Sequence, residues 1–173
     1  MTLEFIRPTP GMKKQAMHFR DGFYAAGEKT INGSGGLDFF PDFETWLTNI
    51  QRVESGEEPG IAPSACIRFA VDADTRELVG ILDIRPALPE NKLHFGHLGY
   101  ATLPGRRGSG IATGMVRWGV EQLRAKGVKD ILASVYADNG PSIKVLEKCG
   151  FLKKGMFKDE DNGKEIIQYV NKA

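Results

Sequence analysis

The sequence has few of the residues that build metal sites, disulfide frameworks or membrane spans. Its two cysteines, Cys66 and Cys149, stand in separate apolar contexts, and its three histidines are not spaced as metal ligands. We therefore expect no metal and no disulfide, with both thiols free and buried in a reducing cytoplasm. Its apolar runs fall well short of the roughly 18 residues that a membrane helix requires, so no membrane partner is expected.

An excess of charge of one sign is also missing. The 23 basic and 22 acidic residues leave a formal net charge of +1, so no global field would attract nucleic acid or anionic lipid. The first residues lack the basic start and apolar core of a signal peptide, which favours a cytoplasmic location. With 173 residues and no internal repeat or linker, the chain fits a single domain, 1–173, with a substantial core.

A basic, glycine-rich stretch stands out between a strand and a helix. The strand ends at Pro104, the loop 105–110 (GRRGSG) follows, and an amphipathic helix runs on to a stop signal at Gly127. Free N–H groups at a helix N-terminus, with two arginines beside them, suit a phosphate or pyrophosphate. The spacing fits neither the dinucleotide fingerprint nor the P-loop. The alternative is a turn whose glycines only permit tight packing.

A second motif follows one strand later, after residues 130–136. Asn139 is suited to cap a helix N-terminus, Pro141 falls in the first turn, and Gly150 marks the end of the helix. The segment therefore reads as an Asn-x-x-Ser helix, with Ser142 as its serine, that ends in Gly-Phe.

Taken in this order, the two motifs resemble those of the GNAT superfamily of acetyl-CoA-dependent N-acetyltransferases, over about residues 66–170. Arg107, Gly110 and Ala112 supply its Arg-x-x-Gly-x-Ala pattern. The resemblance implies an α/β (α+β) fold in one domain, with a mostly antiparallel mixed sheet, a splayed central parallel pair and helices on both faces. The order of elements, antiparallel strands first and βαβα afterwards, agrees with that.

The hydrophobic pattern predicts the elements that surround the motifs. Residues 30–36 are rich in turn formers and are expected to be mobile, and 55–63 and 86–92 are expected to be loops. We predict strands at 3–7, 64–71, 77–85, 93–103, 130–136, 151–158 and 164–170, and helices at 12–26 and 43–54 besides the two motif helices.

The resemblance assigns acetyl-CoA as the acyl donor, with no metal. The pantetheine arm would lie between the splayed strands, against the main chain of Ala101, Thr102 and Leu103. Lys144 would approach a ribose phosphate, although a solvated helix lysine is an equal alternative. The pyrophosphate contacts would come from Arg106, Arg107, Gly108, Ser109, Gly110, Ile111, Ala112 and Thr113, and further contacts from Asn139 and Ser142.

Acetyl transfer to an amine requires a neutral nucleophile, so we looked for a base. Histone-type members carry a glutamate six residues before the apolar residue that ends this strand, and counting back from Leu103 gives His97. A histidine titrates near neutrality and suits that role, or it is a hydrogen-bonded sheet residue. Asp83 and Tyr100 are the other candidates. A lysine acceptor (pKa about 10.4) needs a strong base, whereas an α-amine (about 7.7–8.0) needs a mild one.

Two positions depart from the family pattern. Ser134 stands where some N-terminal acetyltransferases carry a glutamate base, and Leu146 stands where many members carry a tyrosine acid. Ser142 or solvent would then protonate the leaving thiolate. The oxyanion would be stabilised by a main-chain N–H at or near Leu103.

The N-terminal part, 1–63, is expected to form a wall of the acceptor site. Asp38, Phe39 and Phe40 would line it together with Asp83 and Tyr100, or the aromatic residues are core contacts of the helix at 43–54. Acidic residues at 38, 42 and 44 hint at a cationic amine.

The expected acceptor is a primary amine of a small molecule or of a peptide, and a homodimer is conceivable. Two other functions stay open at this point. The chain is either a non-catalytic CoA-binding sensor or scaffold on a GNAT fold, or an unrelated nucleotide-binding α/β domain.

Overall fold

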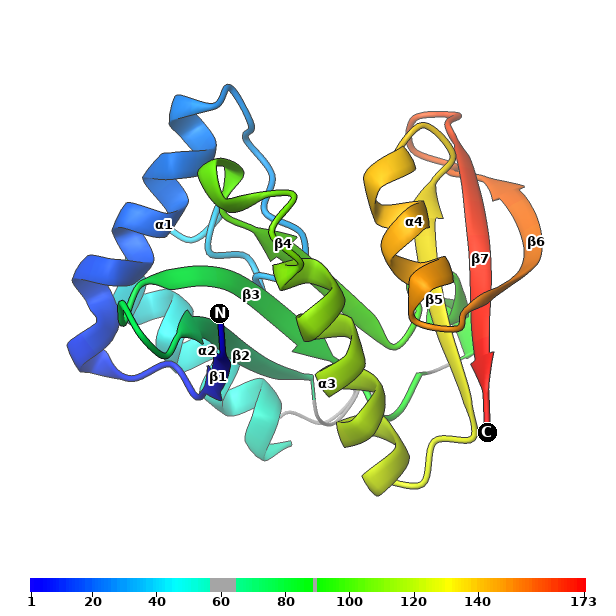
Figure 1. The fold of residues 1–173 in the computed structure, drawn as a ribbon, viewed down its shortest axis with the longest axis horizontal. Coiled ribbons are helices and arrows are strands. Elements are labelled where there is room, and N and C mark those ends of the chain that lie inside the picture. Colours follow the sequence, from blue (N-terminus) through cyan, green and yellow to red (C-terminus); the bar gives the residue numbers. More distant parts are fainter. Residues whose placement is uncertain (57–64, 89) are drawn as a thin grey trace.

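The fold is a layered arrangement of strands and helices, seen in a computed structural model that describes residues 1–56, 65–88 and 90–173, with the backbone alone for 90–92 (Figure 1). The strands are β1 (Leu3–Ile6), β2 (Cys66–Asp72), β3 (Leu78–Ile84), β4 (Leu98–Thr102), β5 (Asp130–Tyr136), β6 (Leu152–Lys158) and β7 (Glu165–Lys172). The α-helices are α1 (Lys13–Ala25), α2 (Phe43–Ser55), α3 (Ile111–Ala125) and α4 (Gly140–Lys148). Short 3-10 segments are η1 (Pro10–Met12), η2 (Glu90–Phe95) and η3 (Pro104–Arg106).

The described strands form two sheets that touch where β4 and β5 begin. The first has the order β1-β2-β3-β4 and the second β5-β7-β6, and all their ladders are antiparallel. A bridge between Gly96 and Ala133 and a 2.7 Å hydrogen bond from His97 N to Leu132 O join them. From there β4 and β5 run the same way and diverge (Figure 1). The fold class and its splayed central pair are confirmed.

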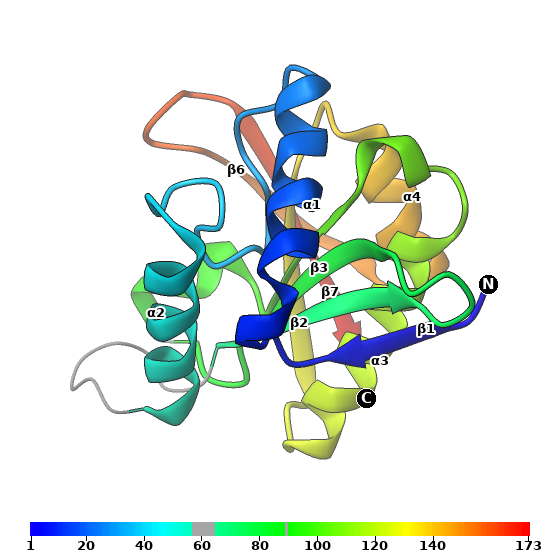
Figure 2. The same cartoon turned by 90° about the vertical axis from the view of Figure 1, so that its left-hand side faces the viewer.

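Two hydrophobic cores lie on opposite faces of the first sheet. Successive strand residues face opposite sides, so Leu82 belongs to the core under α3 and Ile81 to the core under α1 and α2, and both are fully buried. Figure 2 shows α1 lying over the second of these faces, with α2 beside it. The α3 core also receives side chains of α4 and of the second sheet, so it holds the two sheets together.

The helix α2 begins and ends where its sequence signals predict. Asp42 caps it by accepting a hydrogen bond from Thr45 N at 2.7 Å, and Gly56 ends it with φ of +72°. Phe43 and Trp46 are at most 1% exposed, which confirms the core interpretation for these two aromatics.

Two local predictions differ from the structure, and a third concerns residues that the structure mostly does not describe. The strand predicted at 93–103 begins only at Leu98, because η2 and Gly96, with φ of +76°, precede it. Residues 30–36 are packed against β4, since a Cβ on Gly33 would lie 2.2 Å from Gly99 O. The loop predicted at 55–63, and the first residue of the strand predicted at 64–71, lie mostly outside the described residues.

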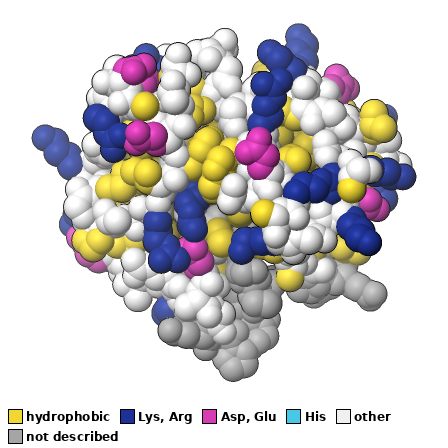
Figure 3. Space-filling view, turned by 60° about the horizontal axis from the view of Figure 1, so that its bottom comes forward, with side chains coloured by type: hydrophobic (Ala, Val, Ile, Leu, Met, Phe, Trp, Pro, Cys, Tyr) yellow, Lys and Arg dark blue, Asp and Glu magenta, His cyan; other side chains and the backbone are white. Residues whose placement is uncertain are grey.

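Side chains of both charges mix on the surface. On the face in Figure 3, basic, acidic and apolar side chains are interspersed. Among the described residues, no three His, Cys, Asp or Glu side chains are grouped so that they could hold a metal ion. No described helix combines the length and apolarity needed to cross a membrane.

Candidate active site

The glycine-rich loop presents a row of unpaired main-chain N–H groups. Gly108 and Gly110 have φ of +80° and +86°, and Ser109 Oγ closes the turn by donating to Arg106 O at 2.6 Å. The N–H groups of residues 108–113 make no hydrogen bond to a described residue. A Cβ on either glycine would meet nothing within 4 Å. Tight packing therefore does not explain these glycines, and the loop is open to a ligand.

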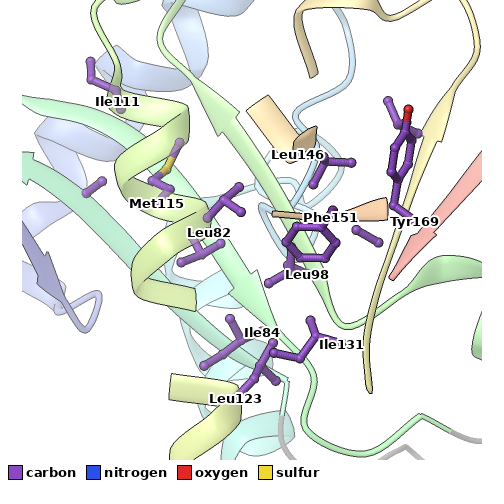
Figure 4. Packing of buried hydrophobic residues seen from close by; sticks show 14 of the residues in the cluster. Leu82, Ile84, Leu98, Ile111, Met115, Leu123, Ile131, Leu146, Phe151 and Tyr169 are labelled. Atoms are coloured by element: carbon purple, nitrogen blue, oxygen red, sulfur yellow. The ribbon is translucent and has the colours of Figure 1, made fainter. Parts of the chain in front are cut away.

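The helix that follows the loop is anchored in the core. Ile111 and Met115 are at most 2% exposed, and Gly119 lies close to Leu98 and Ile84. Figure 4 shows α3 contributing Ile111, Met115 and Leu123 to the cluster that also holds Leu82, Ile84, Leu98, Ile131, Leu146, Phe151 and Tyr169. Ile111 and its two neighbours, residues 112 and 113, therefore offer their main-chain N–H groups from a fixed helix end.

Both arginines of the loop are already paired with carboxylates. Arg107 donates to Glu28 through Nη1 at 2.6 Å and Nη2 at 2.8 Å, and Arg106 pairs with Glu77. The hydrogen bond from Arg107 lowers the pKa of Glu28. The two arginines expected beside the N–H groups are therefore present, each with a carboxylate partner. Because each arginine charge is balanced, the main-chain N–H groups are the loop's free donors.

The strand β4 turns alternate main-chain groups toward the splay. Leu103 N donates to Val79 O at 2.9 Å, and Arg85 N donates to His97 O at 2.7 Å. In an antiparallel ladder the groups of every second residue point the other way, so those of Tyr100 and Thr102 face β5, while those of Ala101 face β3. The N–H of Leu103 is thus engaged, and the neighbouring N–H of Thr102 is the one that faces the splay. An oxyanion donor at or near Leu103 stays a prediction.

The second motif forms the helix terminus that its sequence predicts. Asn139 Oδ1 accepts a hydrogen bond from Ser142 N at 3.1 Å, which leaves the amide NH₂ of Asn139 without a partner among the described residues. Leu146 is 1% exposed and belongs to the core under α3, and Lys144 is exposed. The cap therefore supplies one amide donor at the mouth of the splay.

Tyr100 reaches from β4 to α4. Its hydroxyl lies 2.6 Å from Ser142 Oγ. Burial raises the pKa of Tyr100 to about 12, against the effect of its hydrogen bond with Ser142, so its phenol stays protonated at neutral pH. The contact brings two predicted site residues together and fixes the position of the Ser142 hydroxyl.

His97 lies just before β4 and is 7% exposed. Its Nδ1 accepts a hydrogen bond from Leu132 N at 2.9 Å. Burial, together with the charge of Arg85, lowers its pKa below the usual value, so the ring is neutral at pH 7. The base predicted at this position needs a free lone pair, and the hydrogen bond from Leu132 occupies the single lone pair that a neutral imidazole has.

Asp83 forms a buried ion pair on the neighbouring strand. Its Oδ2 accepts from Arg85 Nε at 3.1 Å and Nη2 at 2.9 Å, while its Oδ1 has no partner among the described residues. Burial raises its pKa, against the charge of Arg85. Arg85 also donates to Gly96 O at 2.8 Å, so it ties β3 to the point where the two sheets meet.

The carboxylates expected at the acceptor wall have structural partners. Asp38 accepts from Ile31 N at 3.2 Å and from Ser34 Oγ at 2.9 Å, which closes its own loop. Asp42 caps α2, as described above, and Glu44 pairs with Lys13 at 2.7 Å. A role for Asp38 in holding a cationic amine stays a prediction.

Of the two phenylalanines of this loop, Phe39 points to the protein surface and Phe40 is partly buried against the core under α1 and α2. Phe39 is 86% exposed and packs edge-on against Phe40, with ring centroids 6.3 Å apart. Phe40 borders a hollow of about 390 Å³ on the outer side of α2, lined also by Glu44, Thr45, Thr48, Asn49 and Arg52. No lining residue of this hollow comes from β4, α3 or α4, so it is separate from the splay.

Three charged residues near these sites were missed by the sequence reasoning. The sequence did contain a signal for Arg85. It stands two residues after Asp83 in a predicted strand, so the two side chains are expected on the same face. Glu28 and Glu77 carried none, since each lies far along the chain from the arginine it pairs with.

The chain is similar to proteins of one acetyltransferase family. A sequence model described as "Acetyltransferase (GNAT) family" matches residues 33–151. Mycothiol acetyltransferase of Corynebacterium glutamicum (strain R) is 28% identical over 116 residues, which cover 66% of this chain and 37% of that protein. The chain thus spans little more than a third of the length of this curated relative.

Solved structures of acetyltransferases share the fold along nearly the whole chain. The ribosomal L7/L12 alpha-N-protein acetyltransferase RimL, in complex with coenzyme A, has a TM-score of 0.74 and 16% identity, covering 99% of this chain and 94% of its own. The microcin C7 self-immunity acetyltransferase MccE, in complex with acetyl-CoA and AMP, has a TM-score of 0.72 and 14% identity. The match covers 99% of this chain and 92% of the MccE chain. At such identities the likeness concerns the fold.

Proposed function

The chain belongs to the GNAT acetyltransferase family, and we propose on this basis that it moves an acetyl group from acetyl-CoA directly to a primary amine. The observation that carries the proposal is the row of free N–H groups at residues 108–113, beside glycines that no protein atom approaches. We treat residues 1–173 as one acetyltransferase domain. Cys66 and Cys149 form no disulfide, which fits a reducing, cytoplasmic setting.

The loop and the start of α3 would hold the pyrophosphate of the donor. Hydrogen bonds to charged groups contribute about 1.5–3 kcal/mol each, so a few of the six N–H groups suffice for micromolar affinity, about 8 kcal/mol. Arg106, Arg107 and Lys144 would add charge at the edges of the site. The pantetheine arm would run along β4, against the main chain of Tyr100 and Thr102, with the amide NH₂ of Asn139 on its other side.

The chemistry assigned to these residues is direct transfer. The amine nitrogen bonds to the thioester carbon, the C–S bond breaks, and the proton lost by nitrogen balances the one gained by sulfur. A main-chain N–H at Thr102 would stabilise the oxyanion, where one such donor contributes about 2.7–4 kcal/mol. The Ser142 hydroxyl, positioned by Tyr100, would donate to the leaving sulfur. His97 lies just before the same strand.

The acceptor is proposed as a primary amine of a small molecule or of a peptide. The similar proteins support both classes, since one is named for mycothiol and another for the N-terminus of a ribosomal protein. Asp38, Phe39 and Phe40 would contribute the wall on the α1–α2 side, with Tyr100 beside it, and Asp83 would lie beneath the floor, out of contact with the amine. A homodimer stays a prediction.

Thermal unfolding in the presence of acetyl-CoA tests the proposal. We expect acetyl-CoA to raise the melting temperature of the parent protein, because a ligand that binds only the folded state stabilises it. Gly110→Trp, which fills the open space of the loop, should abolish the shift. Gly11→Trp is the matched control, since Gly11 also has no neighbour within 4 Å but precedes α1. An unchanged parent at millimolar acetyl-CoA would contradict the proposal.

A non-catalytic CoA sensor on the same fold is the second candidate. The burial of Leu146 in place of a phenol, and the occupied lone pair of His97, favour it. Release of free CoA thiol in the presence of a panel of amines separates the two functions. A sensor would show the thermal shift without amine-dependent thiol release.

A further inference from the structure

His97 presents an N–H group, not a lone pair, at its outer nitrogen. A neutral imidazole has one N–H and one lone pair. The main-chain N–H of Leu132 can only donate, and it donates to Nδ1, so the lone pair is on Nδ1 and the hydrogen on Nε2. Turning the ring over would place a carbon against this N–H and leave it unpaired in the interior, at a cost of about 1–3 kcal/mol.

The same contact opposes protonation of the ring. An imidazolium carries hydrogen on both nitrogens, so its Nδ1–H would point at the N–H of Leu132. The surrounding charges act in the same direction. Arg85, which follows β3, lies near the ring and is paired with Asp83. The main chain of Leu132 on β5 faces Nδ1. The segment η2 carries His94, whose ring packs tilted or edge-on against aromatic neighbours. Taking up an amine proton would therefore cost the ring its main hydrogen bond.

The outer nitrogen of His97 is not sealed inside the protein. Nε2 makes no hydrogen bond to a described residue, yet it is not among the enclosed polar atoms that lack a partner. Asp83 Oδ1 is among them. This oxygen is unpaired but sealed inside the protein, so it cannot meet an amine without a rearrangement of β3 and β4. Of these two candidate bases, His97 turns a hydrogen-bond donor outward, and Asp83 has a free lone pair that is enclosed.

We propose that His97 donates a hydrogen bond through Nε2–H to an oxygen of the bound reactants and does not remove the amine proton. The acceptor is accordingly a weakly basic amine that arrives uncharged, such as the α-amino group of a peptide, and not a lysine side chain. This inference rests on the proposed acetyl transfer and narrows its acceptor.

The expected selectivity follows from the neutral fraction of each amine. With pKa values of about 10.4 for a lysine side chain and 7.7–8.0 for an α-amine, the uncharged fraction at pH 7 differs by roughly 230- to 420-fold. An enzyme without a base should show a preference of that size at pH 7, and the preference should shrink as the pH rises toward 10.

The parent protein provides the first test. Two peptides of the same length are supplied with acetyl-CoA, one with a free α-amine and no lysine, the other with a blocked N-terminus and one lysine. We expect the α-amine peptide to react on the order of 10²-fold faster or more at pH 7, with the gap closing at high pH. Equal rates at pH 7, or a faster lysine peptide, would overturn the inference and leave the acetyltransferase proposal intact.

Variants of His97 provide the second test. In His97→Asn the side-chain oxygen can accept from Leu132 N–H and the NH₂ group remains a donor, so we expect the rate within about tenfold of the parent and an unchanged acid limb of the pH–rate profile. His97→Leu removes both groups and should lose far more. If His97 were a base, both variants would lose about 10²–10⁴-fold and the acid limb would move. No thiol release from either peptide, with any variant, would overturn the proposed function and this inference together.

Discussion

Two glycine-rich loops of this protein have similar sequences and opposite structural roles. In the loop before α3, a Cβ on Gly108 or Gly110 would meet no atom within 4 Å. In the loop between α1 and α2, a Cβ on Gly33 would lie 2.2 Å from Gly99 O and 2.6 Å from Tyr100 N. The first loop leaves room for a ligand, whereas the second is already filled by the protein's own main chain. A glycine's role is therefore decided by what stands opposite its Cα.

The two loops also differ in how they use their charged residues. Asp38 binds groups within its own loop, while Arg107 reaches out to Glu28 at the end of α1. That ion pair joins the loop before α3 to the segment that follows α1. The four substitutions that follow probe this difference in order of decreasing effect on stability.

The largest effect is expected for Gly33→Ala. The new methyl group would collide with the main chain of β4, and φ of +70° is unfavourable for alanine. Overpacking and a left-handed conformation together cost about 3 kcal/mol or more. Urea unfolding followed by circular dichroism measures it, and a loss below about 1 kcal/mol would show that this loop is not closed on β4.

Glu54→Gln should have the next largest effect, by loosening α2 from the first sheet. Burial alone would raise the pKa of Glu54, but hydrogen bonds from Arg68 and Arg7 outweigh it and lower the pKa to about 2. Hydrogen bonds to charged groups contribute about 1.5–3 kcal/mol, which is the loss expected at pH 7.

The pH dependence of this effect has a definite sign. A carboxylate whose pKa is lowered on folding stabilises above its unfolded pKa and loses that contribution as the pH falls. The difference between parent and Glu54→Gln should therefore be constant above about pH 4.5 and shrink toward pH 2. A difference that stays constant over this range would rule out the two arginine bonds as its source.

Gly108→Ala should cost less, about 1–2 kcal/mol, because only the left-handed conformation is strained and no atom stands in the way. Gly105→Ala is the matched control, since Gly105 has neither a positive φ nor a neighbour within 4 Å. We expect that control within about 0.5 kcal/mol of the parent. Chemical unfolding of both variants without acetyl-CoA separates conformation from ligand binding.

The smallest effect on stability is expected for Glu28→Gln, at most about 1 kcal/mol, because the Glu28–Arg107 pair is exposed. Removing this carboxylate beside the loop before α3 should instead tighten acetyl-CoA binding by roughly 2- to 10-fold. Arg107 is released, and a negative charge that would repel the pyrophosphate is lost. Calorimetric titration measures the dissociation constant. Glu44→Gln, which breaks an exposed ion pair between α2 and α1, serves as the control. Weaker binding by Glu28→Gln would contradict the idea that Glu28 and acetyl-CoA compete for Arg107.

Local signals made much of this fold predictable. Asn139 caps α4 and Gly150, with φ of +80°, ends it, as the sequence indicates. Gly127, with φ of +84°, likewise follows α3. Such signals act within one or two turns of the chain, so a single sequence contains all the information they need. The family and the splayed pair followed from two of these local motifs in the right order.

Contacts between distant parts of the chain could not be predicted. Nothing in the sequence tells that Gly33 rests on Gly99, because that depends on how the two cores pack. The hydrogen bond from Leu103 N to Val79 O depends on ladder register, and a shift of one residue would have exchanged the roles of Leu103 and Thr102. The site's main-chain donors therefore had to be read from the structure.

The position of β7 bears on how this protein is made. It is the last strand in sequence order but the middle one of the second sheet, between β5 and β6. On the ribosome, β5 and β6 have no ladder partner in the second sheet until residues 165–172 emerge, so this sheet cannot form before that segment is made. The first sheet, whose four strands are consecutive, can assemble much earlier. A premature stop before residue 165 should yield a product that contains the loop before α3 but lacks the second sheet, which packs against the same core as α3.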